Sequence, residues 1–559
     1  MAGSNYKSVA DVLTERAIVA RPDAMVFRGN GVPAEAVPGD ELLARAQRAA
    51  AAMRAYGVSP GDRVLLMLSS QSDFIEAFFG AIWADAIPVP LFPPIFARRP
   101  EDFVASFGEI AVRSGAGFLI ASDNDVGILT AFTSRFGESF RIVPRSAWSA
   151  TSERLTDEPQ RCSDDIALLQ YTSGSTGAPK GVALSHSNVL ANVHVIGRAI
   201  DFSARDVGVS WLPLYHDMGL IGMLTTQYWG SSMVVMSPLD FARDPSTWLR
   251  AISEHRGTLS PAPNFAYLRS TRLSEEELSD IDLSSWRLAL CGAEHVDPGT
   301  VRDFTRRFAP YGFRSTAFYP VYGLAEHTLA VSFPPLGREP VVDNIDRDRL
   351  ATSGVATAID EEHDSALSLV SVGIPLEGVT VVIRDKEGQP LPEGQVGELV
   401  VKSDCVMTGY FHDAEATAEA LSDGWLRTGD LGYFRNGMLY ITGRIKDMII
   451  RNGRKYFPHD IELAATEVRG VRPGRVTAFS LLARAGKEHL VVLAETNGSA
   501  GNTDVELVRR IGTAVAKRIG FRPDEVALCA RDALPITSSG KVRRRLARDR
   551  FCNGELPSN

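Results

Sequence analysis

The sequence has 559 residues, of which 45% are hydrophobic and 23% are charged, and its formal net charge at pH 7 is -9. This length exceeds what one hydrophobic core usually serves, so we expect two or more domains. The composition excludes a disordered or collagen-like chain. The negative charge provides no overall attraction to nucleic acid, so we expect a small molecule or a protein as the partner.

The cysteine pattern and the most apolar segment both favour a cytoplasmic protein without a membrane span. The five cysteines lack the CxxC spacing of a zinc site, which fits a reducing compartment. The N-terminal segment MAGSNYKSVADVL is polar and lacks the layout of a signal peptide. The most apolar window, residues 77–96, contains Asp85 and four prolines, which interrupt it well short of the ~18 apolar residues that cross a bilayer.

The first part of the chain has the pattern of a layered α/β fold. Between Val9 and Phe92, helical patterns such as residues 41–58 alternate with β-rich runs such as residues 62–69. The alternation continues through residues 208–253. Residues 371–403 then form short β-branched runs separated by glycine and proline, which predicts a small β subdomain.

A second domain is predicted near the C-terminus. The β pattern ends near residues 443–450, and a new α/β unit follows that includes the helical pattern at 504–519. The last ~110 residues are enough for a compact domain. We therefore predict a large N-terminal domain over residues 1–444 and a small α+β domain, able to move, over residues 445–559.

The segment YTSGSTGAPKGV, residues 171–182, is a candidate phosphate-binding loop. It follows a predicted buried strand at 164–171 and precedes a strand and helix at 181–200. Successive backbone N–H groups and hydroxyls can surround phosphate oxygens, and Lys180 adds positive charge. The common GxxxxGK[ST] loop is excluded, because Pro179 precedes the lysine. A flexible turn is the alternative for a generic glycine cluster, but the complete string favours phosphate binding.

This loop resembles the signature of the adenylate-forming superfamily, which includes acyl-CoA synthetases, luciferases and nonribosomal adenylation domains. The match continues in order along nearly the whole chain, so it is specific. Its other motifs are FYPVYGLAEHTL (318–329), GWLRTGDLGYF (424–434), GRIKDMIIRNGRKYFPHDIE (443–462) and LPITSSGKVRR (534–544).

Within the superfamily, the chain is similar to fatty acyl-AMP ligases. The segments WLPLYHDMGLIG (211–222), PAPNFAY (261–267) and YFPHDIE (456–462) carry this similarity, together with a long link at 334–373. The resemblance implies ATP-dependent activation of a fatty or related acid to acyl-AMP, with release of pyrophosphate. The acyl group then passes to a phosphopantetheine thiol, and the link disfavours free CoA by restraining the moving domain.

The activation step determines which residues the resemblance assigns to ATP and Mg²⁺. The acid oxygen attacks the α-phosphorus, so negative charge must be neutralised on both reactants. The loop is expected to hold the β and γ phosphates, Tyr322 the adenine, and Asp430 both ribose hydroxyls, since a carboxylate offers two acceptor oxygens. The implied nucleotide set is Thr172, Ser173, Gly174, Ser175, Thr176, Gly177, Lys180, Gly292, Ala293, Glu294, Tyr322, Gly323, Asp430 and Arg444, with Thr176 and Glu326 as Mg²⁺ ligands.

Three residues are predicted to act in catalysis by the same resemblance. Lys541, in the SSGK loop, is expected to bridge the carboxylate and the α-phosphate, although a lone lysine in the basic run 541–550 would usually be solvated. Glu326 is expected to act through Mg²⁺. His216 is a candidate gate between the ATP and acyl sites, although a lone histidine is often a core residue. Domain closure is expected about Lys446, the match to the hinge residue of the family.

Several alternatives remain at this stage. An acyl-CoA synthetase would use the same residues with free CoA, and a thioester-forming enzyme would take a preformed acyl-adenylate. A nucleotide sensor would be expected to lack Lys541, Glu326 or Asp430, and all three are present. The basic run 541–550 fits either an acidic carrier protein or a solvated helix. Departures from the family pattern occur at Ile536, His327 and His295, and none removes a catalytic group.

Overall fold

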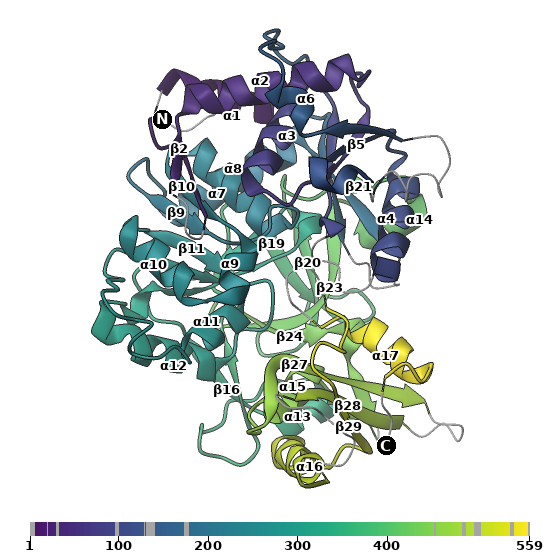
Figure 1. The fold of residues 1–559 in the computed structure, drawn as a ribbon. Helices are drawn as coiled ribbons and strands as arrows, with labels where there is room; N and C mark the ends of the chain where they lie inside the picture. Colours follow the sequence, from purple (N-terminus) through teal and green to yellow (C-terminus); the bar gives the residue numbers. More distant parts are fainter. Residues whose placement is uncertain are drawn as a thin grey trace.

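The computed structural model describes residues 6–19, 21–29, 33–94, 100–127, 129, 140–172, 178–451, 454–482, 488–496, 505–536 and 542–556. These residues form a large body and a smaller C-terminal lobe, which lies at the bottom of Figure 1. The body consists of layered α/β units and a β subdomain, and the lobe is α+β, as the sequence predicts. In the described part of the chain, no helix is long and apolar enough to cross a membrane.

A parallel four-stranded sheet forms the first layer, in the order β4-β3-β5-β6. Helix α2 packs on α3 through small residues, because a Cβ atom at Gly80 would lie 2.6 Å from the Ala49 Cβ atom. The predicted strand 62–69 and helix 41–58 correspond to β3 and α2. The elements are α2 (Gly39–Ala55), β3 (Arg63–Met67), α3 (Gln71–Trp83), β4 (Ile87–Pro90), α4 (Pro100–Ser114), β5 (Phe118–Ala121), β6 (Arg141–Pro144) and α6 (Ser146–Ser149).

A seven-stranded sheet lies at the centre of the body, in the order β13-β12-β11-β9-β10-β1-β2. All its pairs are parallel except the edge pair β1–β2. Parallel strands end at the same edge, so the loops after them gather there. The strands are β1 (Met25–Arg28), β2 (Glu35–Val37), β9 (Val207–Ser210), β10 (Ser232–Met236), β11 (Leu259–Ala262), β12 (Leu288–Cys291) and β13 (Phe318–Pro320).

Helices cover both faces of this sheet. Helix α7 begins with a capping box, in which the side chains of Ser185 and Asn188 each accept a hydrogen bond from the other residue's backbone N–H. Helix α8 packs against α7 and the strands. The helices of this layer are α1 (Val9–Val19), α7 (His186–Ala199), α8 (Asp217–Tyr228), α9 (Pro238–Arg243), α10 (Ser246–Glu254), α11 (Asn264–Ser270) and α12 (Pro298–Phe308).

Two smaller sheets bring the glycine loop and the β subdomain to the same region. The loop joins β7 (Ile166–Thr172) to β8 (Lys180–Ser185), and β8 also pairs with β21 (Gly409–Tyr410). The β subdomain contains β19 (Thr380–Arg384), β20 (Gly397–Lys402), β22 (Leu421–Ser422), β23 (Trp425–Arg435) and β24 (Met438–Arg444), with α14 (Ala414–Ala420) beside it. A further sheet contains β14 (Tyr322–Gly323), β15 (Ala330–Phe333) and β18 (Ile374–Pro375).

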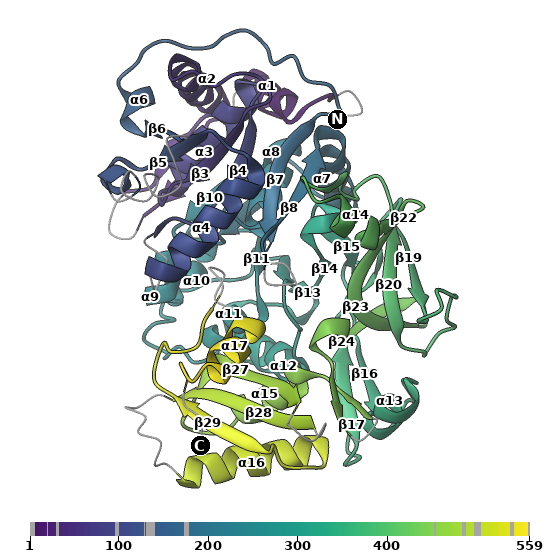
Figure 2. The same ribbon diagram turned by 90° about the vertical axis from the view of Figure 1, so that its right-hand side faces the viewer.

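The long link at 334–373 is folded and contacts the C-terminal lobe. Strands β16 (Val342–Asp346) and β17 (Ala366–Val370) form an antiparallel pair, and α13 (Arg347–Ser353) joins the lobe at β26. Figure 2 shows β16, β17 and α13 alongside the lobe. Their apolar side chains share one core with Phe457 of the lobe and with Tyr433 and Tyr440 of the β subdomain.

The C-terminal lobe has a three-stranded sheet with helices on both faces. Its two main cores contain only residues from Ile449 onward. The predicted helix at 504–519 is α16, which buries Leu507, Ile511 and Val515 at helical spacing. The elements are β25 (Ile449–Arg451), β26 (Arg454–Tyr456), α15 (Pro458–Thr466), β27 (Val471–Leu482), β28 (Glu488–Thr496), α16 (Val505–Ile519), β29 (Glu525–Cys529) and α17 (Arg544–Cys552).

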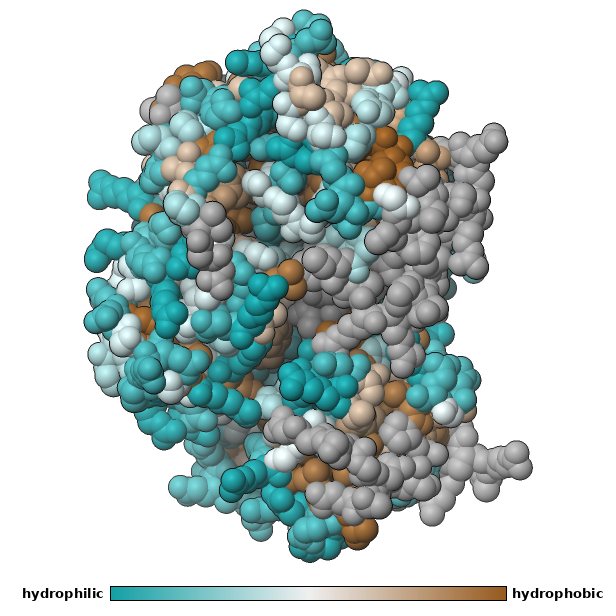
Figure 3. All heavy atoms as spheres, viewed as in Figure 1, coloured by the Kyte–Doolittle hydropathy of each residue, from teal (hydrophilic) through white to brown (hydrophobic). Residues whose placement is uncertain are grey.

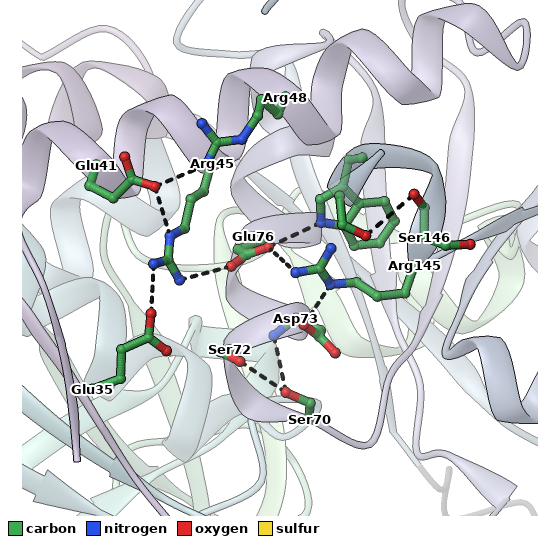
Figure 4. Close-up of polar contacts among 12 residues, drawn as sticks. Glu35, Glu41, Arg45, Arg48, Ser70, Ser72, Asp73, Glu76, Arg145 and Ser146 are labelled. Atoms are coloured by element: carbon green, nitrogen blue, oxygen red, sulfur yellow. Dashed lines mark hydrogen bonds and ion pairs between the residues drawn. The ribbon is translucent and has the colours of Figure 1, made fainter. Parts of the chain in front are cut away.

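A buried carboxylate connects α2, α3 and the segment around α6. Glu76 is 4% exposed, and it accepts hydrogen bonds from Arg45 at 3.3 Å and from the Trp148 indole at 3.0 Å. Arg145 approaches it at 3.0 Å and also donates to Asp73 at 2.6 Å (Figure 4). These four contacts join residues that lie at least 31 positions apart in the chain, so they fix the packing of the first layer.

Replacing Glu76 tests this role. We expect Glu76→Leu to destabilise the body by about 3 kcal/mol, because it leaves two arginines without their shared carboxylate. The measurement is the midpoint of thermal unfolding by calorimetry. Glu41→Gln is the matched control, since Glu41 is 40% exposed in its ion pair with Arg45 and exposed pairs contribute ~1 kcal/mol or less. Equal midpoints for the two variants would contradict this assignment.

Candidate functional site

A cavity of about 2550 Å³ lies between the body and the C-terminal lobe and extends into the body. Figure 3 shows a hollow at this level, bordered by hydrophilic side chains where described atoms are visible. Most of the described residues of the predicted nucleotide and catalytic sets are on its wall, whereas Gly292 is not. Those on the wall are Thr172, Lys180, His216, Ala293, Glu294, Tyr322, Gly323, Glu326, Asp430 and Arg444.

Asp430, on β23 of the β subdomain, accepts hydrogen bonds from two side chains. The Tyr322 hydroxyl donates to its Oδ2 at 2.6 Å, and Arg444 Nε donates to its Oδ1 at 2.8 Å. Asp430 and Arg444 face each other across β23 and β24, which brings them together by strand register. Asp430 is 3% exposed, whereas the Arg444 side chain is 63% exposed. The arginine therefore remains accessible to a ligand while the carboxylate is fixed.

The protonation states in this trio follow from their surroundings. Burial raises the pKa of Tyr322 well above 10, and the adjacent Asp430 charge raises it further. The same carboxylate raises the pKa of Arg444. Tyr322 therefore stays a hydrogen-bond donor and Arg444 stays a cation. Each Asp430 oxygen retains a further lone pair, so the carboxylate can still accept two ligand hydroxyls.

Glu326 lies on a short helical turn beside β21 and β8. The Tyr410 hydroxyl donates to Glu326 Oε1 at 2.9 Å, and the Lys180 ammonium lies 4.7 Å from the centre of the Tyr410 ring. Burial raises the pKa of Glu326. Tyr410 therefore connects the lysine of the glycine loop with the predicted metal ligand. The sequence motifs gave no role to this tyrosine.

Strained backbone occurs beside two of the predicted segments. Ala293 has φ of 67° and Thr328 has φ of 64°, a region that residues with a Cβ atom rarely occupy. The Thr328 hydroxyl donates to the Cys405 carbonyl at 2.8 Å. Glu294, next to Ala293, accepts a hydrogen bond from the Phe265 backbone at 2.6 Å. Tertiary contacts thus hold both turns in conformations that place them against the cavity.

His327, one of the departures from the family pattern, has a structural environment. Its Nε2 lies 2.7 Å from the Ser403 hydroxyl, and the side chain is fully buried. Burial lowers the pKa of His327 to about 4. The ring is therefore neutral near pH 7 and connects the Glu326 turn with the segment that precedes β21.

His216 occupies the N-cap position of α8 on the cavity wall. Its ring centre lies 4.9 Å from that of Tyr215. Gln170, which is 3% exposed, donates from its amide to the Tyr215 carbonyl at 2.9 Å. Gln170 therefore fixes the turn that presents His216, and the sequence motifs did not single it out.

Part of the predicted site lies outside the described residues, namely Lys541 and the loop residues Ser173, Gly174, Ser175, Thr176 and Gly177. The ends of both segments are described. Thr172 pairs with Lys180 across β7 and β8. On the two sides of the segment that contains Lys541, Ile536 and Val542 form a β-bridge.

The hinge segment is connected to the base of α17. Arg544 Nη1 lies 2.5 Å from Asp447 Oδ2, and Arg544 Nη2 lies 2.8 Å from Glu462 Oε1. Asp447 follows the predicted hinge residue Lys446 in the same turn. Arg544 comes three residues after Lys541, so these ion pairs position the helix that follows the predicted catalytic lysine.

Two histidines stack across the interface between the body and the lobe. His295, from the loop after β12, and His459, from α15, have ring centres 4.1 Å apart and nearly parallel planes at 26°. The pKa of each is lowered to about 3, chiefly by burial, and for His295 also by repulsion from His459. Arg518 and Asp460 lie next to this pair. The stack therefore contributes to docking of the lobe only while both rings are neutral.

This stack predicts a pH-dependent lobe position. A histidine outside the interface titrates near pH ~6.5, so below that pH the undocked state binds more protons. The contribution of the pair is present above that pH and decreases as the pH falls. We expect the lobe to separate from the body between pH ~7 and ~5, observed as a longer distance between fluorophores on the two parts. Replacing both histidines by phenylalanine keeps stacked rings and should abolish the change; an unaltered pH response would contradict the assignment.

The comparisons with known proteins agree with this geometry. The model of the AMP-binding enzyme family matches residues 15–411, and a Disco-interacting protein 2-like AMP-domain model matches residues 446–559. The chain is 34% identical to the long-chain-fatty-acid–AMP ligase FadD32 of Mycolicibacterium smegmatis, over 97% of this chain and 94% of the relative. It is 35% identical to the medium-chain-fatty-acid–[acyl-carrier-protein] ligase JamA of Moorena producens, over 89% and 87%.

A solved structure gives the same result. A fatty acyl-adenylate ligase, from work on such enzymes of E. coli and L. pneumophila, superposes with a TM-score of 0.92 at 33% identity, covering 99% of both chains. The resemblance and the fold class that the sequence predicts are thereby confirmed. This chain belongs to the AMP-binding enzyme family, in which its relatives include fatty acyl-AMP ligases.

Proposed function

We propose that this enzyme activates a fatty acid with ATP to acyl-AMP and transfers the acyl group to the phosphopantetheine thiol of a carrier protein. The observation that carries the proposal is the Asp430 carboxylate held by Tyr322 and Arg444 on the same cavity as Glu326 and Lys180. The names of the relatives, which include a fatty-acid–carrier-protein ligase, support the same substrates.

In the first step, a carboxylate oxygen of the acid attacks the α-phosphorus of ATP. The bond from that phosphorus to the bridging oxygen breaks, and pyrophosphate leaves. Asp430 accepts hydrogen bonds from the ribose hydroxyls, and Arg444 contacts the ribose. The positive charge of Lys180 faces the phosphates. We assign Lys541 to the α-phosphate and carboxylate, where a cation offsets the charge that develops.

Glu326 fits a Mg²⁺ site of the kind that nucleotide enzymes use. The Tyr410 hydroxyl donates to one oxygen of Glu326. The raised pKa of Glu326 indicates a buried carboxylate whose charged form a cation would stabilise. No cluster of three or more metal-ligating side chains occurs among the described residues. Mg²⁺ is commonly held by one or two carboxylates together with substrate phosphates. We assign Glu326 and Thr176 as its protein ligands; the ion supplies positive charge to the phosphates.

In the second step, the thiol sulfur attacks the acyl carbonyl and AMP leaves. We propose that residues 445–559 turn about Lys446 relative to residues 1–444 between the two steps, in the cytoplasm where ATP is available. The folded link favours a carrier over free CoA, because it packs against Phe457 and its Asp348 approaches Arg454 at 3.4 Å. These contacts restrain the lobe, so productive rotation needs the binding energy of a protein partner.

The ribose assignment predicts that Asp430→Asn weakens ATP binding at least ~10-fold. The substitution keeps the shape but removes the charge that pairs with Arg444, and hydrogen bonds to charged groups contribute about 1.5–3 kcal/mol. Titration calorimetry with ATP and Mg²⁺ measures the effect. Glu506→Gln is a control, because Glu506 forms an exposed ion pair with Arg509 on α16 and does not line the cavity. Wild-type affinity in Asp430→Asn would refute the ribose role.

The reaction itself is tested by mass spectrometry of the products. With ATP, Mg²⁺ and a fatty acid we expect acyl-AMP, little acyl-CoA when CoA is added, and acyl carrier when a phosphopantetheinylated carrier is added. Lys541→Ala should reduce adenylate formation ~100-fold or more, while the protein still transfers a supplied acyl-AMP. Abundant acyl-CoA would identify a CoA synthetase. No adenylate from any acid would refute the activation step.

A further inference from the structure

One face of α8 forms a wall of the inner part of the cavity. Met218, Gly222, Thr225 and Thr226 line the cavity at spacings of one and two helical turns. From Met218 to Tyr228 every residue of α8 is buried except Gly222. Since the helix packs inside the body, the exposure of Gly222 is toward the cavity.

The other walls of this inner part are apolar. They come from α7, from the loop after it and from three strands of the central sheet. These residues are Ile196, Ile200, Phe202, Gly208, Met233 and Leu259. An alkyl chain gains about 25 cal/mol for each Å² of apolar surface that it buries in such surroundings.

The two threonines on the α8 face do not make this wall polar. The Thr225 hydroxyl donates to the Ile221 carbonyl at 2.7 Å, and the Thr226 hydroxyl donates to the Met223 carbonyl at 2.7 Å. Both hydroxyls are thus used within the helix. The Thr226 methyl group points to Gly208, since a Cβ atom built on Gly208 would lie 3.0 Å from that methyl group.

The two glycines of α8 have different surroundings. A Cβ atom on Gly219 would overlap the Pro213 carbonyl oxygen, so packing requires glycine there. A Cβ atom on Gly222 would have no described heavy atom within 4 Å beyond its own helix. Glycine inside a helix costs about 1 kcal/mol relative to alanine. At Gly222 no contact with the described residues accounts for that cost, and Gly222 itself lines the cavity.

We propose that Gly222 sets the length of acyl chain that the enzyme accepts, by keeping the channel between α8, α7 and the central sheet open beyond His216. The inference rests on the proposed function and names its substrate class, a long unbranched alkyl acid. Gly222 lies six residues beyond His216, about 9 Å along the helix at ~1.5 Å per residue. A side chain at Gly222 would therefore stop a long chain while leaving room for a short one.

The test is acyl-AMP formation by the full chain with straight-chain acids of increasing length. We expect Gly222→Phe to lower kcat/KM for long acids ~10-fold or more while short acids keep theirs, and Gly222→Ala to retain most activity toward long acids. Gly127→Phe is the matched control, because Gly127 is exposed and no described heavy atom lies within 4 Å of its Cβ position. Gly127→Phe should leave the dependence of kcat/KM on acid length unchanged.

Uniform loss for all acids in a folded Gly222→Phe protein, or no change at all, would overturn the inference. Thermal unfolding establishes whether the variant folds; if it does not, Gly222→Leu replaces it with the same expected profile. The same assay distinguishes this outcome from failure of the proposed function, because in that case the wild-type protein would form no acyl-AMP from any acid. Wild-type activity confined to the shortest acids would also overturn the inference.

Discussion

The ion pair between Asp430 and Arg444 lies where the body ends and the C-terminal lobe begins. Arg444 is the last residue of β24, and the turn Ile445–Asp447 follows directly. A nucleotide that engages Asp430 and Arg444 would therefore act on the residue from which the lobe departs. The Tyr322 hydroxyl holds the carboxylate from the opposite side, so Asp430 has a fixed position beside the start of the lobe.

The lobe is held to the body by contacts of different chemistry. The link contributes apolar packing around Phe457, which depends little on pH or salt. The His295–His459 stack contributes only in the neutral state of both rings. Arg544 acts within the lobe, because it connects Asp447 and Glu462 and so makes α17 turn with the hinge. If the lobe rotates as we propose, the apolar contact would resist that rotation at any pH, whereas the histidine stack would be lost once either ring is protonated.

Sequence reasoning succeeded where chemistry is contained in a short segment. The strand and helix patterns gave the layers of the fold. The structure places Glu326 and Asp430, which the motifs assign to the same nucleotide site, on the wall of one cavity. It missed Tyr410 and Gln170, because their roles come from contacts with residues 84 and 45 positions away. A tyrosine after a glycine turn, or a glutamine in an apolar strand, has no local pattern that distinguishes it from a packing residue.

The dimensions of the proposed acyl channel also could not be predicted from local sequence patterns. Gly219 and Gly222 are equivalent in the sequence, since both interrupt one helical pattern at a spacing of three residues. Only the fold distinguishes them: the first lies against the backbone before α8, and the second faces open space. That space is bounded by α7, β9, β10 and β11, which come from separate parts of the chain. We therefore expect the motifs to determine the reaction, and the packing of those elements around Gly222 to limit the length of the acid.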